Sequence, residues 1–512
     1  MSRLVARIAQ HAQDSSRRAV VQDDVTWTFH ELTQNVNRLA SRLVNAGIQP
    51  GDRVAMIFSN QKEFLLALLA IRQMGGVAVP INIQMPPGDI LYVMLNSGSK
   101  LILADKHFAG HLGACPIPVW ISGATEGSFT RLEDELARGD AQFQPPGREA
   151  SEQLHLLLYT SGTTDKPKGV MLSEENLLAN IEGFDALLHL APDEHILLAL
   201  PLFHAFGLIV GLYGLTIGAT IALVPNFSPK QIVSSLTAQK ITVLPLVPTM
   251  FRVVLQAVQK HGQPLPHLKY AISGGASLPK ELLRAVESGL GVTLLEGYGL
   301  TETAPVLAVN TPAQGSIPGS VGQILPNVSL KLVDDSGKSL PIARGNVSAE
   351  GEILVKGPNV MAGYYNLPEA TAEAFDAEGY FRTGDLGHVD ADGNLFISGG
   401  RKKDLIIKAG ENIAPLRIEQ VLYQHPQVAE ACVVGVPDER TGEEILACIQ
   451  LKPLQDGETA PDENTLRKFC AEHLSPLFVP KFYRFFDELP KTATGKVSKK
   501  LLKTQLNALQ PA

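Results

Sequence analysis

Between positions 159 and 169 the chain reads Tyr159-Thr-Ser-Gly-Thr-Thr-Asp-Lys-Pro-Lys-Gly169. The apolar run that leads into it, Leu154 to Tyr159, predicts a buried strand, and the small hydroxyl and glycine residues predict a tight loop. Backbone N–H groups of such a loop can surround phosphate oxygens, while Lys166 and Lys168 add positive charge. The spacing differs from G-x-x-x-x-G-K-[ST], so it indicates neither a P-loop kinase nor a GTPase. Taken alone, the segment could also be a Ser/Thr-rich surface turn.

Strand and helix patterns alternate around this loop. Arg53–Phe58, Gly76–Pro80 and Leu101–Ala104 read as strands, Glu63–Met74 has apolar residues three and four apart, and Ser173 is typical of a helix N-cap. Alternation of this kind predicts parallel sheets with right-handed crossovers. We therefore predict an α/β fold whose large N-terminal domain contains doubly wound parallel sheets.

The pattern changes after Gly319 to short strands separated by turns, which predicts a small β subdomain. Helix and strand signals resume at Pro415–His425 and Ala429–Val436. We place a domain boundary between them, near Gly399–Asp404. The predicted domains are residues 1–402 and a smaller, mobile α+β domain of residues 403–512. The turn signals lie at 334–337, 376–379 and 390–393.

Composition bounds the function. The chain has 512 residues, 45% of them hydrophobic and 19% charged, with a net charge of −8, so it is a folded protein and nucleic acid is not the expected partner. From Arg401 onward there are 16 Lys and Arg against 15 Asp and Glu, so the tail is relatively basic. Four cysteines without C-x-x-C spacing suggest reduced thiols. The first ten residues carry Arg3 and Arg7 and lack a signal core, which favours a cytoplasmic location.

An uncharged stretch runs from Ile196 to Pro229. Its length alone would nominate a membrane helix, and a buried strand, turn and core helix form the alternative. Proline, glycine and histidine interrupt the stretch, so we expect protein core and no transmembrane span, which leaves room for peripheral membrane contact.

Further motifs follow the loop in a fixed order. They are Glu296-Gly-Tyr-Gly-Leu-Thr-Glu-Thr303, Tyr380-Phe-Arg-Thr-Gly-Asp-Leu386, Gly400-Arg-Lys-Lys-Asp404 and Pro490-Lys-Thr-Ala-Thr-Gly-Lys496. With the loop, they resemble the adenylate-forming superfamily of acyl-CoA synthetases, peptide-synthetase adenylation domains and luciferase, most of all the fatty-acyl-CoA ligases. The resemblance implies an acid–thiol ligase that uses ATP and Mg²⁺. A carboxylate would displace pyrophosphate from ATP, and the acyl-adenylate would then pass to coenzyme A or to carrier-protein phosphopantetheine.

The resemblance also assigns roles to residues. Glu302 would ligate Mg²⁺, which prefers oxygen ligands, Thr301 would contact the α-phosphate, and Asp385 and Arg401 would hold the ribose. Adenine would lie between the segment Gly274, Gly275 and Ala276 and the pair Tyr298 and Gly299. The β- and γ-phosphates would be held by Thr160, Ser161, Gly162, Thr163, Thr164 and Lys168.

Two lysines of the C-terminal region complete this set. Lys496 resembles the catalytic lysine that bridges the carboxylate and the α-phosphate, although by itself it would read as part of a solvated basic tail. Lys403 occupies the hinge position about which the C-terminal domain of the family rotates. Asp165 stands where the family usually has glycine, and its carboxylate adds negative charge near ATP.

The acyl pocket is expected after Leu200. His204 occupies the position of an aromatic gate, although a histidine satisfied in the core is an equal alternative. Ala205 replaces the aspartate that pairs with an amino-acid ammonium in peptide synthetases, so an amino-acid substrate is disfavoured. The expected walls are small or apolar, which favours a medium- or long-chain fatty acid as the substrate. An aryl acid as substrate and a carrier protein as acceptor remain open. Luciferase-like oxygenation, and a membrane or binding protein without catalysis, also remain open. These walls are Gly207–Val210, Val247–Met250, Gly275, Gly299 and Pro305–Ala308.

Overall fold

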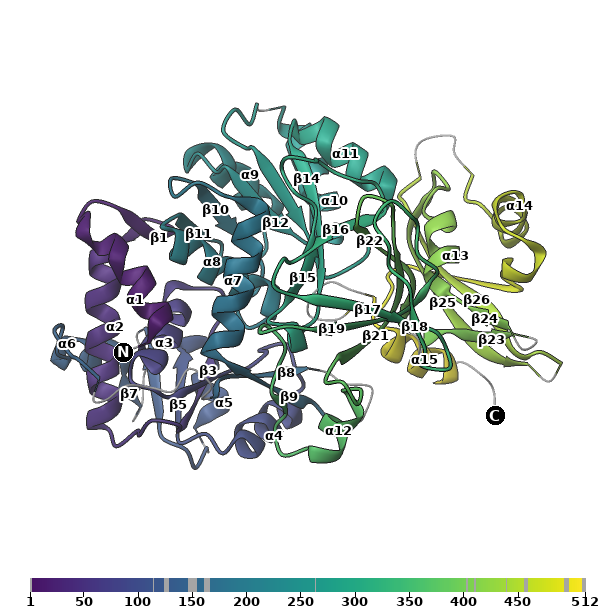
Figure 1. Ribbon diagram of the computed structural model, residues 1–512. Helices are drawn as coiled ribbons and strands as arrows, with labels where there is room; N and C mark the ends of the chain where they lie inside the picture. The colour runs from purple at the N-terminus through teal and green to yellow at the C-terminus, as the bar shows by residue number, and fades with distance from the viewer. Residues whose placement is uncertain are drawn as a thin grey trace.

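The computed structural model contains a large lobe and a smaller C-terminal lobe, coloured purple to green and light green to yellow in Figure 1. The structure describes residues 2–113, 115–123, 129–145, 154–160, 166–262, 264–401, 404–408, 411–438, 440–454, 459–491 and 497–508.

The first sheet of the large lobe has eight strands in the order β20-β9-β8-β4-β3-β5-β6-β7. Strands β8, β4, β3, β5, β6 and β7 pair in parallel, as the alternation of strand and helix predicts. The bounds are β3 (Arg53–Ile57), β4 (Val77–Pro80), β5 (Leu101–Asp105), β6 (Val119–Ser122), β7 (Thr130–Arg131), β8 (Leu154–Thr160), β9 (Lys168–Ser173) and β20 (Gly363–Tyr364).

The second sheet has fourteen strands and joins the parallel core to the β subdomain. Its order is β18-β17-β19-β21-β22-β16-β15-β14-β13-β12-β10-β11-β1-β2, parallel from β14 to β1 and antiparallel elsewhere. The bounds are β1 (Arg18–Gln22), β2 (Val25–Thr28), β10 (His195–Leu198), β11 (Thr220–Leu223), β12 (Val243–Leu246), β13 (Tyr270–Ser273), β14 (Thr293–Gly299), β15 (Val306–Val309), β16 (Ser320–Ile324), β17 (Ser329–Val333), β18 (Ser339–Leu340), β19 (Gly351–Lys356), β21 (Phe381–Val389) and β22 (Asn394–Arg401).

Helices pack on these sheets and bury their apolar stripes in three hydrophobic clusters. The fold is therefore α/β with a large N-terminal body, as predicted. The bounds are α1 (Arg3–Ala9), α2 (Phe29–Asn45), α3 (Lys62–Gln73), α4 (Pro87–Ser97), α5 (Ala109–Leu112), α6 (Leu132–Arg138), α7 (Glu174–Leu188), α8 (Ala205–Ile217), α9 (Pro229–Ala238), α10 (Pro248–His261), α11 (Lys280–Leu290) and α12 (Pro368–Glu373).

The phosphate-loop motif connects two antiparallel strands. Thr160 at the end of β8 pairs with Lys168 at the start of β9. Strand β9 then leads into α7, where the Ser173 hydroxyl accepts a hydrogen bond from the Asn176 backbone N–H, so the predicted N-cap is confirmed. Sequence reasoning missed β9 because its lysine, glycine and serine interrupt the apolar pattern.

The uncharged stretch forms β10, α8 and β11, and the core of the large lobe contains most of its side chains. Tyr213 of α8 is 1% exposed. Among the described residues, none of the helices combines the length and apolarity required to cross a bilayer. The interpretation of this stretch as protein core is confirmed.

The C-terminal lobe has its own sheet, in which β26 pairs with β23, β25 and β27. The sheet packs against α13 and α14 through one hydrophobic cluster and against α15 through a second cluster. The predicted boundary at residues 402 and 403 lies outside the described residues and stays a prediction. The bounds are β23 (Ile406–Lys408), β24 (Glu411–Ile413), α13 (Pro415–Leu422), β25 (Val428–Asp438), β26 (Gly442–Leu451), α14 (Glu463–His473), β27 (Phe482–Phe486) and α15 (Lys499–Ala508).

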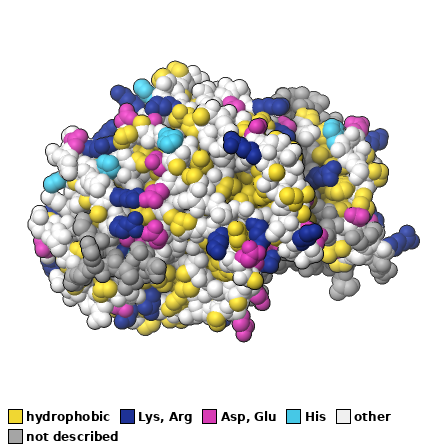
Figure 2. Space-filling view, viewed as in Figure 1, with side chains coloured by type: hydrophobic (Ala, Val, Ile, Leu, Met, Phe, Trp, Pro, Cys, Tyr) yellow, Lys and Arg dark blue, Asp and Glu magenta, His cyan; other side chains and the backbone are white. Residues whose placement is uncertain are grey.

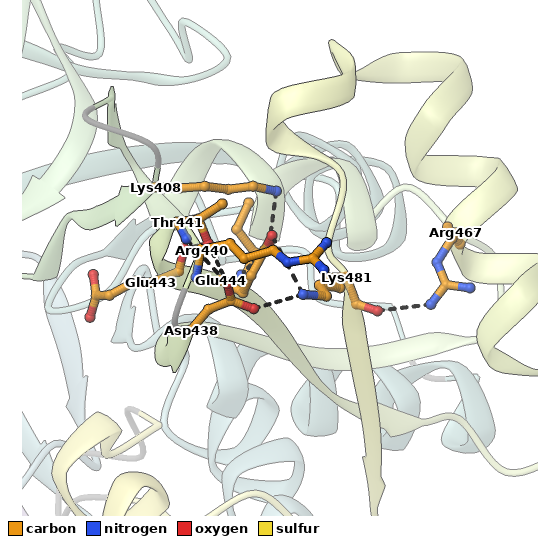
Figure 3. A network of polar contacts seen from close by, with 9 residues as sticks. Lys408, Asp438, Arg440, Thr441, Glu443, Glu444, Arg467 and Lys481 are labelled. Atoms are coloured by element: carbon orange, nitrogen blue, oxygen red, sulfur yellow. Dashed lines mark hydrogen bonds and ion pairs between the residues drawn. The ribbon is translucent and has the colours of Figure 1, made fainter.

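A network of ion pairs ties the strands of this lobe together (Figure 3). Lys481, just before β27, lies 2.7 Å from an Asp438 oxygen at the end of β25, and Lys408 of β23 lies 2.9 Å from a Glu444 oxygen in β26. Asp438 also accepts hydrogen bonds from the Arg440 and Thr441 backbones. The lysine and these donors hold the pKa of Asp438 well below its usual range.

Charges of both signs cover the face of the molecule seen in Figure 2, where Lys and Arg side chains mix with Asp and Glu. Arg3 and Glu175 lie 2.6 Å apart at the joint between α1 and α7, and Arg7 and Glu182 form a second pair there. These pairs are partly exposed and contribute little individually to stability.

His155 gives the large lobe a predicted acid sensitivity. Its ring is 1% exposed in β8, and burial, followed by the nearby charge of Arg72, lowers its pKa to about 2. Below pH 6.5 the unfolded chain binds a proton at this position that the folded chain does not. We expect the free energy of unfolding to fall by up to about 1.4 kcal/mol per pH unit from this group as pH decreases below about 6.5.

Denaturant unfolding between pH 7.5 and 5 measures this effect. His155→Leu should flatten the acid dependence, whereas His30→Leu, at an exposed position of α2, should leave it unchanged. Identical pH dependence in wild type and His155→Leu would contradict the assignment.

Candidate active site

The candidate site is built at the carboxyl ends of β13 and β14. These strands are parallel neighbours, with Ser273 opposite Glu296. On its other side β14 pairs with antiparallel β15, so the parallel order of the sheet ends here. Open α/β sheets bind ligands at the carboxyl ends of their strands where the order changes. The predicted adenine segment follows β13, and the motif from Glu296 to Thr303 occupies the end of β14 and the turn after it.

The predicted adenine segment is closely packed against α8. A β-carbon added at Gly274 would lie 3.1 Å from the Phe206 ring, so the backbone and the ring are in contact. Gly275 has a φ of +79°, which favours glycine, and it is exposed beside the half-buried Ala276. The buried Glu296 carboxyl accepts a hydrogen bond from the Leu278 backbone N–H at 3.2 Å. Burial raises the pKa of Glu296 to about 8, which favours its neutral form relative to an exposed glutamate.

Tyr298 and Asp385 come together from distant parts of the chain. The Tyr298 hydroxyl donates a 2.6 Å hydrogen bond to the Asp385 carboxylate, which is 8% exposed on β21. The structure therefore places the predicted adenine and ribose residues in direct contact. Arg401 on β22 lies opposite Asp385 in the strand register, and its side chain is outside the description.

The turn between β14 and β15 carries Thr301 and Glu302 on a short 3-10 helix, η3 (Thr301–Thr303). A β-carbon at Gly299 would lie 1.8 Å from the Pro305 carbonyl oxygen, so only glycine fits there. The buried Asn180 side chain donates hydrogen bonds to the carbonyls of Thr303 and Val306 at 3.1 and 2.7 Å. Asn359, also buried, donates to the same carbonyls at 2.9 and 3.3 Å. These two amides satisfy the buried backbone and fix the turn.

Lys168 and Glu302 both contact the side chain of one tyrosine. The Lys168 Nζ lies 5.1 Å from the centre of the Tyr364 ring, within the range of a cation–π contact. The Tyr364 hydroxyl donates a 2.9 Å hydrogen bond to Glu302 Oε1. The structure thus brings a predicted phosphate ligand and the predicted metal ligand to one side chain.

The chemistry of Glu302 suits Mg²⁺, because the cation prefers carboxylate oxygens and retains water and substrate oxygens. Among the described residues, no group of three or more His, Cys, Asp and Glu side chains gathers to form a metal cage. A cation at Glu302 would therefore be completed by phosphate and water oxygens.

His204 forms the N-cap position of α8, next to the predicted adenine segment. Its ring lies 4.8 Å from that of Phe203, centre to centre, and it is half-buried. Phe206, two residues further on, touches Gly274. The predicted acyl-pocket segment therefore adjoins the predicted nucleotide segment.

Several predicted residues lie outside the described residues, and their roles stay predictions. These are Ser161, Gly162, Thr163, Thr164, Asp165, Lys403 and Lys496.

The described residues on each side of 492–496 are anchored in the C-terminal lobe. Lys491 lies 3.0 Å from a Glu430 oxygen of β25, and Lys499 lies 3.4 Å from a Glu419 oxygen of α13. Lys491 and Val497 form an isolated β-bridge.

Sequence reasoning missed the residues that support these groups. Tyr364, Asn180 and Asn359 come from elements far from the motifs that they contact. Of these three residues, Tyr364 is preceded by a glycine, and the Gly363-Tyr364 pair forms the short strand β20. This pair is a weak sequence indication of a supporting residue.

Residues 8–365 match the family model of the AMP-binding enzymes, and residues 417–496 match the model of the AMP-binding enzyme C-terminal domain. The chain belongs to the AMP-binding enzyme family, the adenylate-forming superfamily that its motifs resemble, and it is an acid–thiol ligase of the AMP-forming type.

Curated relatives match over nearly the whole chain. A sulfoacetate–CoA ligase of Cupriavidus necator is 36% identical, over 92% of this chain and 91% of its own. A feruloyl-CoA synthase of Amycolatopsis is 35% identical, over 96% of both chains. A long-chain-fatty-acid–CoA ligase of Bacillus subtilis is 32% identical, over 93% and 89%. These relatives are named as CoA ligases or a CoA synthase and differ in the acid, so the fatty acid substrate is not confirmed.

A solved structure matches the whole molecule. ATP-bound MatB from Rhodopseudomonas palustris is 33% identical, covers 98% of both chains and has a TM-score of 0.89. Apo MatB from the same organism, with the same coverage, has a TM-score of 0.79. The present structure is therefore more similar to the ATP-bound form than to the apo form.

The contact between Tyr298 and Asp385 leads to a prediction about ATP. Tyr298→Phe removes a donor to a buried carboxylate, and a hydrogen bond to a charged group is worth about 1.5–3 kcal/mol. We expect the KM for ATP to rise about tenfold or more, with the KM for the acid unchanged. Tyr270→Phe, at the opposite end of β13, is the matched control. An equal rise in both KM values would show that the change acts through the fold instead.

Proposed function

We propose that the protein activates an apolar monocarboxylic acid, a medium- or long-chain fatty acid in the first place, and transfers its acyl group to coenzyme A. The observation that supports this most directly is that three groups of predicted site residues lie on adjacent elements. These are the Tyr298–Asp385 pair, the Lys168–Tyr364–Glu302 cluster, and the start of α8 at His204 and Phe206.

Charge neutralisation explains why the reaction needs these residues. A carboxylate and a triphosphate are both anions, so they approach only where positive charge and fixed dipoles offset their repulsion. In our proposal Lys168 and the hydroxyl-rich loop from Thr160 to Thr164 hold the β- and γ-phosphates, and Thr301 contacts the α-phosphate. Glu302 holds Mg²⁺, which supplies further positive charge at the phosphates. Asp385 and Arg401 hold the ribose, with adenine beside Tyr298.

The proposed acid site lies at the start of α8. Phe206 touches Gly274, and a β-carbon added at Gly275 would lie 3.6 Å from Val247. The neighbouring wall, Pro305 to Ala308, is apolar. An acid with a second carboxylate or a sulfonate would lack a cation in these segments, and burying an unpaired charge is costly. The wall therefore favours an uncharged alkyl or aryl group.

An aryl acid is the second candidate. The Phe206 ring at the edge of the nucleotide segment offers a face for an aromatic substrate, since aromatic rings prefer stacked or edge contacts. The feruloyl-CoA synthase among the relatives acts on an acid of this kind by its name. Coenzyme A is the proposed acceptor because the relatives are named CoA ligases, with a carrier protein as the alternative.

A carboxylate panel tests the substrate. Straight-chain fatty acids from acetate to palmitate, benzoate and hydroxycinnamates, and the dicarboxylates oxalate and malonate are each scored by ATP-dependent pyrophosphate release. Products are then measured with coenzyme A and with holo acyl carrier protein. We expect the medium and long chains to have the highest kcat/KM and the dicarboxylates to be at least about tenfold poorer, because of the unpaired charge. A preference for dicarboxylates would overturn the apolar assignment.

Lys496 gives a test of the two-step reaction. Lys496→Ala should abolish acyl-adenylate formation, because it removes the cation proposed to bridge the carboxylate and the α-phosphate, and should spare thioester formation from supplied acyl-adenylate. Lys503→Ala, on the exposed face of α15, is the control for the basic tail. Normal pyrophosphate release by Lys496→Ala would exclude the proposed role.

A further inference from the structure

The residues before α12 connect the two halves of the proposed metal and phosphate site. Strand β20 pairs with β9, with Tyr364 opposite Val170. The Tyr365 backbone N–H donates to the Gly169 carbonyl at 2.7 Å, next to Lys168. A few residues earlier, the Met361 backbone N–H donates to the Glu302 carbonyl at 2.8 Å. The backbone from 361 to 365 is thus fixed to the element that carries Lys168 and to the one that carries Glu302.

Tyr364 makes side-chain contacts to both charges from this position. Its ring face lies under the Lys168 ammonium at 5.1 Å, and its hydroxyl, at the edge of the ring, donates to Glu302 Oε1 at 2.9 Å. Among the described residues Lys168 and Glu302 form no ion pair with each other, although both contact the Tyr364 side chain. One tyrosine side chain therefore contacts two residues of opposite charge.

The placement of Tyr364 is itself constrained. Its backbone N–H donates to the Thr371 hydroxyl at 2.9 Å. Gly363 has a φ of +142°, and a β-carbon there would lie 2.5 Å from the Thr371 methyl group. A larger residue at 363 would displace β20, so the ring has a fixed position relative to β9 and η3.

We propose that Tyr364 is a positioning residue that keeps Lys168 and Glu302 apart and oriented for their separate ligands. The inference rests on the proposed roles of Lys168 at the phosphates and of Glu302 at Mg²⁺. The cation–π contact orients the ammonium without neutralising it, so its charge stays available to phosphate oxygens. The hydroxyl donates to one carboxylate oxygen of Glu302 and so fixes the plane of the carboxylate, which leaves the other oxygen available to the metal. Without the ring, the ammonium and carboxylate would pair with each other and compete with both ligands.

Calorimetric titration of the enzyme with ATP, in EDTA and in Mg²⁺, separates the two functions of the side chain. Tyr364→Phe keeps the ring and removes the hydroxyl. It should leave the Kd for ATP in EDTA unchanged and reduce the gain in affinity given by Mg²⁺ about tenfold. Tyr364→Leu removes the ring as well, and it should weaken binding in EDTA and in Mg²⁺. Equal changes under both conditions for Tyr364→Phe, or no change in either, would overturn the proposal.

Tyr365→Phe is the matched control, since this neighbouring side chain packs in the cluster of Tyr159 and Met171 on the other face of the strand. It should bind ATP as the wild type does, and each variant's unfolding midpoint checks that it folds. Lys168→Met and Glu302→Gln distinguish the two levels of the argument. If these two variants bind ATP normally with and without Mg²⁺, the proposed roles of Lys168 and Glu302 fail. If they lose affinity while the Tyr364 variants do not, only the role of Tyr364 fails.

Discussion

The tight turn between β14 and β15 is the constraint on which the rest of the site depends. Gly299 lies so close to the Pro305 carbonyl that no side chain fits, and two buried asparagine amides hold the carbonyls of Thr303 and Val306. Tyr298 precedes this turn, and Glu302 lies within it. A shift of the turn would therefore move the proposed nucleoside and metal contacts together. Buried amides are costly to leave unpaired, so these two hold the turn in place.

Tyrosine side chains contact three of the charged groups of the site. Asp385 accepts from a tyrosine hydroxyl, Glu302 from another, and Lys168 lies over a ring face. Burial raises the pKa of a nearby acid, Glu296, to about 8, so its neutral form is favoured relative to an exposed glutamate. Ion pairs have a structural function elsewhere, for example in the C-terminal lobe, where Lys481 and Lys408 contact Asp438 and Glu444 (Figure 3). An ammonium or carboxylate that is oriented but not neutralised can bind a charged ligand.

Local patterns sufficed for much of the fold. Apolar runs predicted β3, β4, β5 and β8, the Ser173 cap predicted the start of α7, and interruptions by proline and glycine identified the uncharged stretch as core. The motifs also contained Tyr298, Glu302, Lys168 and Asp385, which the structure brings together in two contacting groups. The supporting roles of Asn180, Asn359 and Tyr364 could not be predicted from the sequence, because these residues act through contacts to residues 50 or more positions away. Strand β9 was missed for a related reason, since its pairing with β8 compensates for a weak apolar pattern.

The arrangement explains how one framework serves acids as different as sulfoacetate, ferulate and long-chain fatty acids, named for three relatives of this chain. The proposed nucleotide contacts are spread over β9, η3, β20 and β21, where backbone pairing and buried amides fix them. The proposed acid site instead includes side chains at the start of α8, such as Phe206, which contacts the nucleotide segment at Gly274. We expect exchange of those side chains to alter the acid that is accepted without disturbing the turn at Gly299. Specificity can therefore change by substitution on one helix, while the chemistry stays with the sheet.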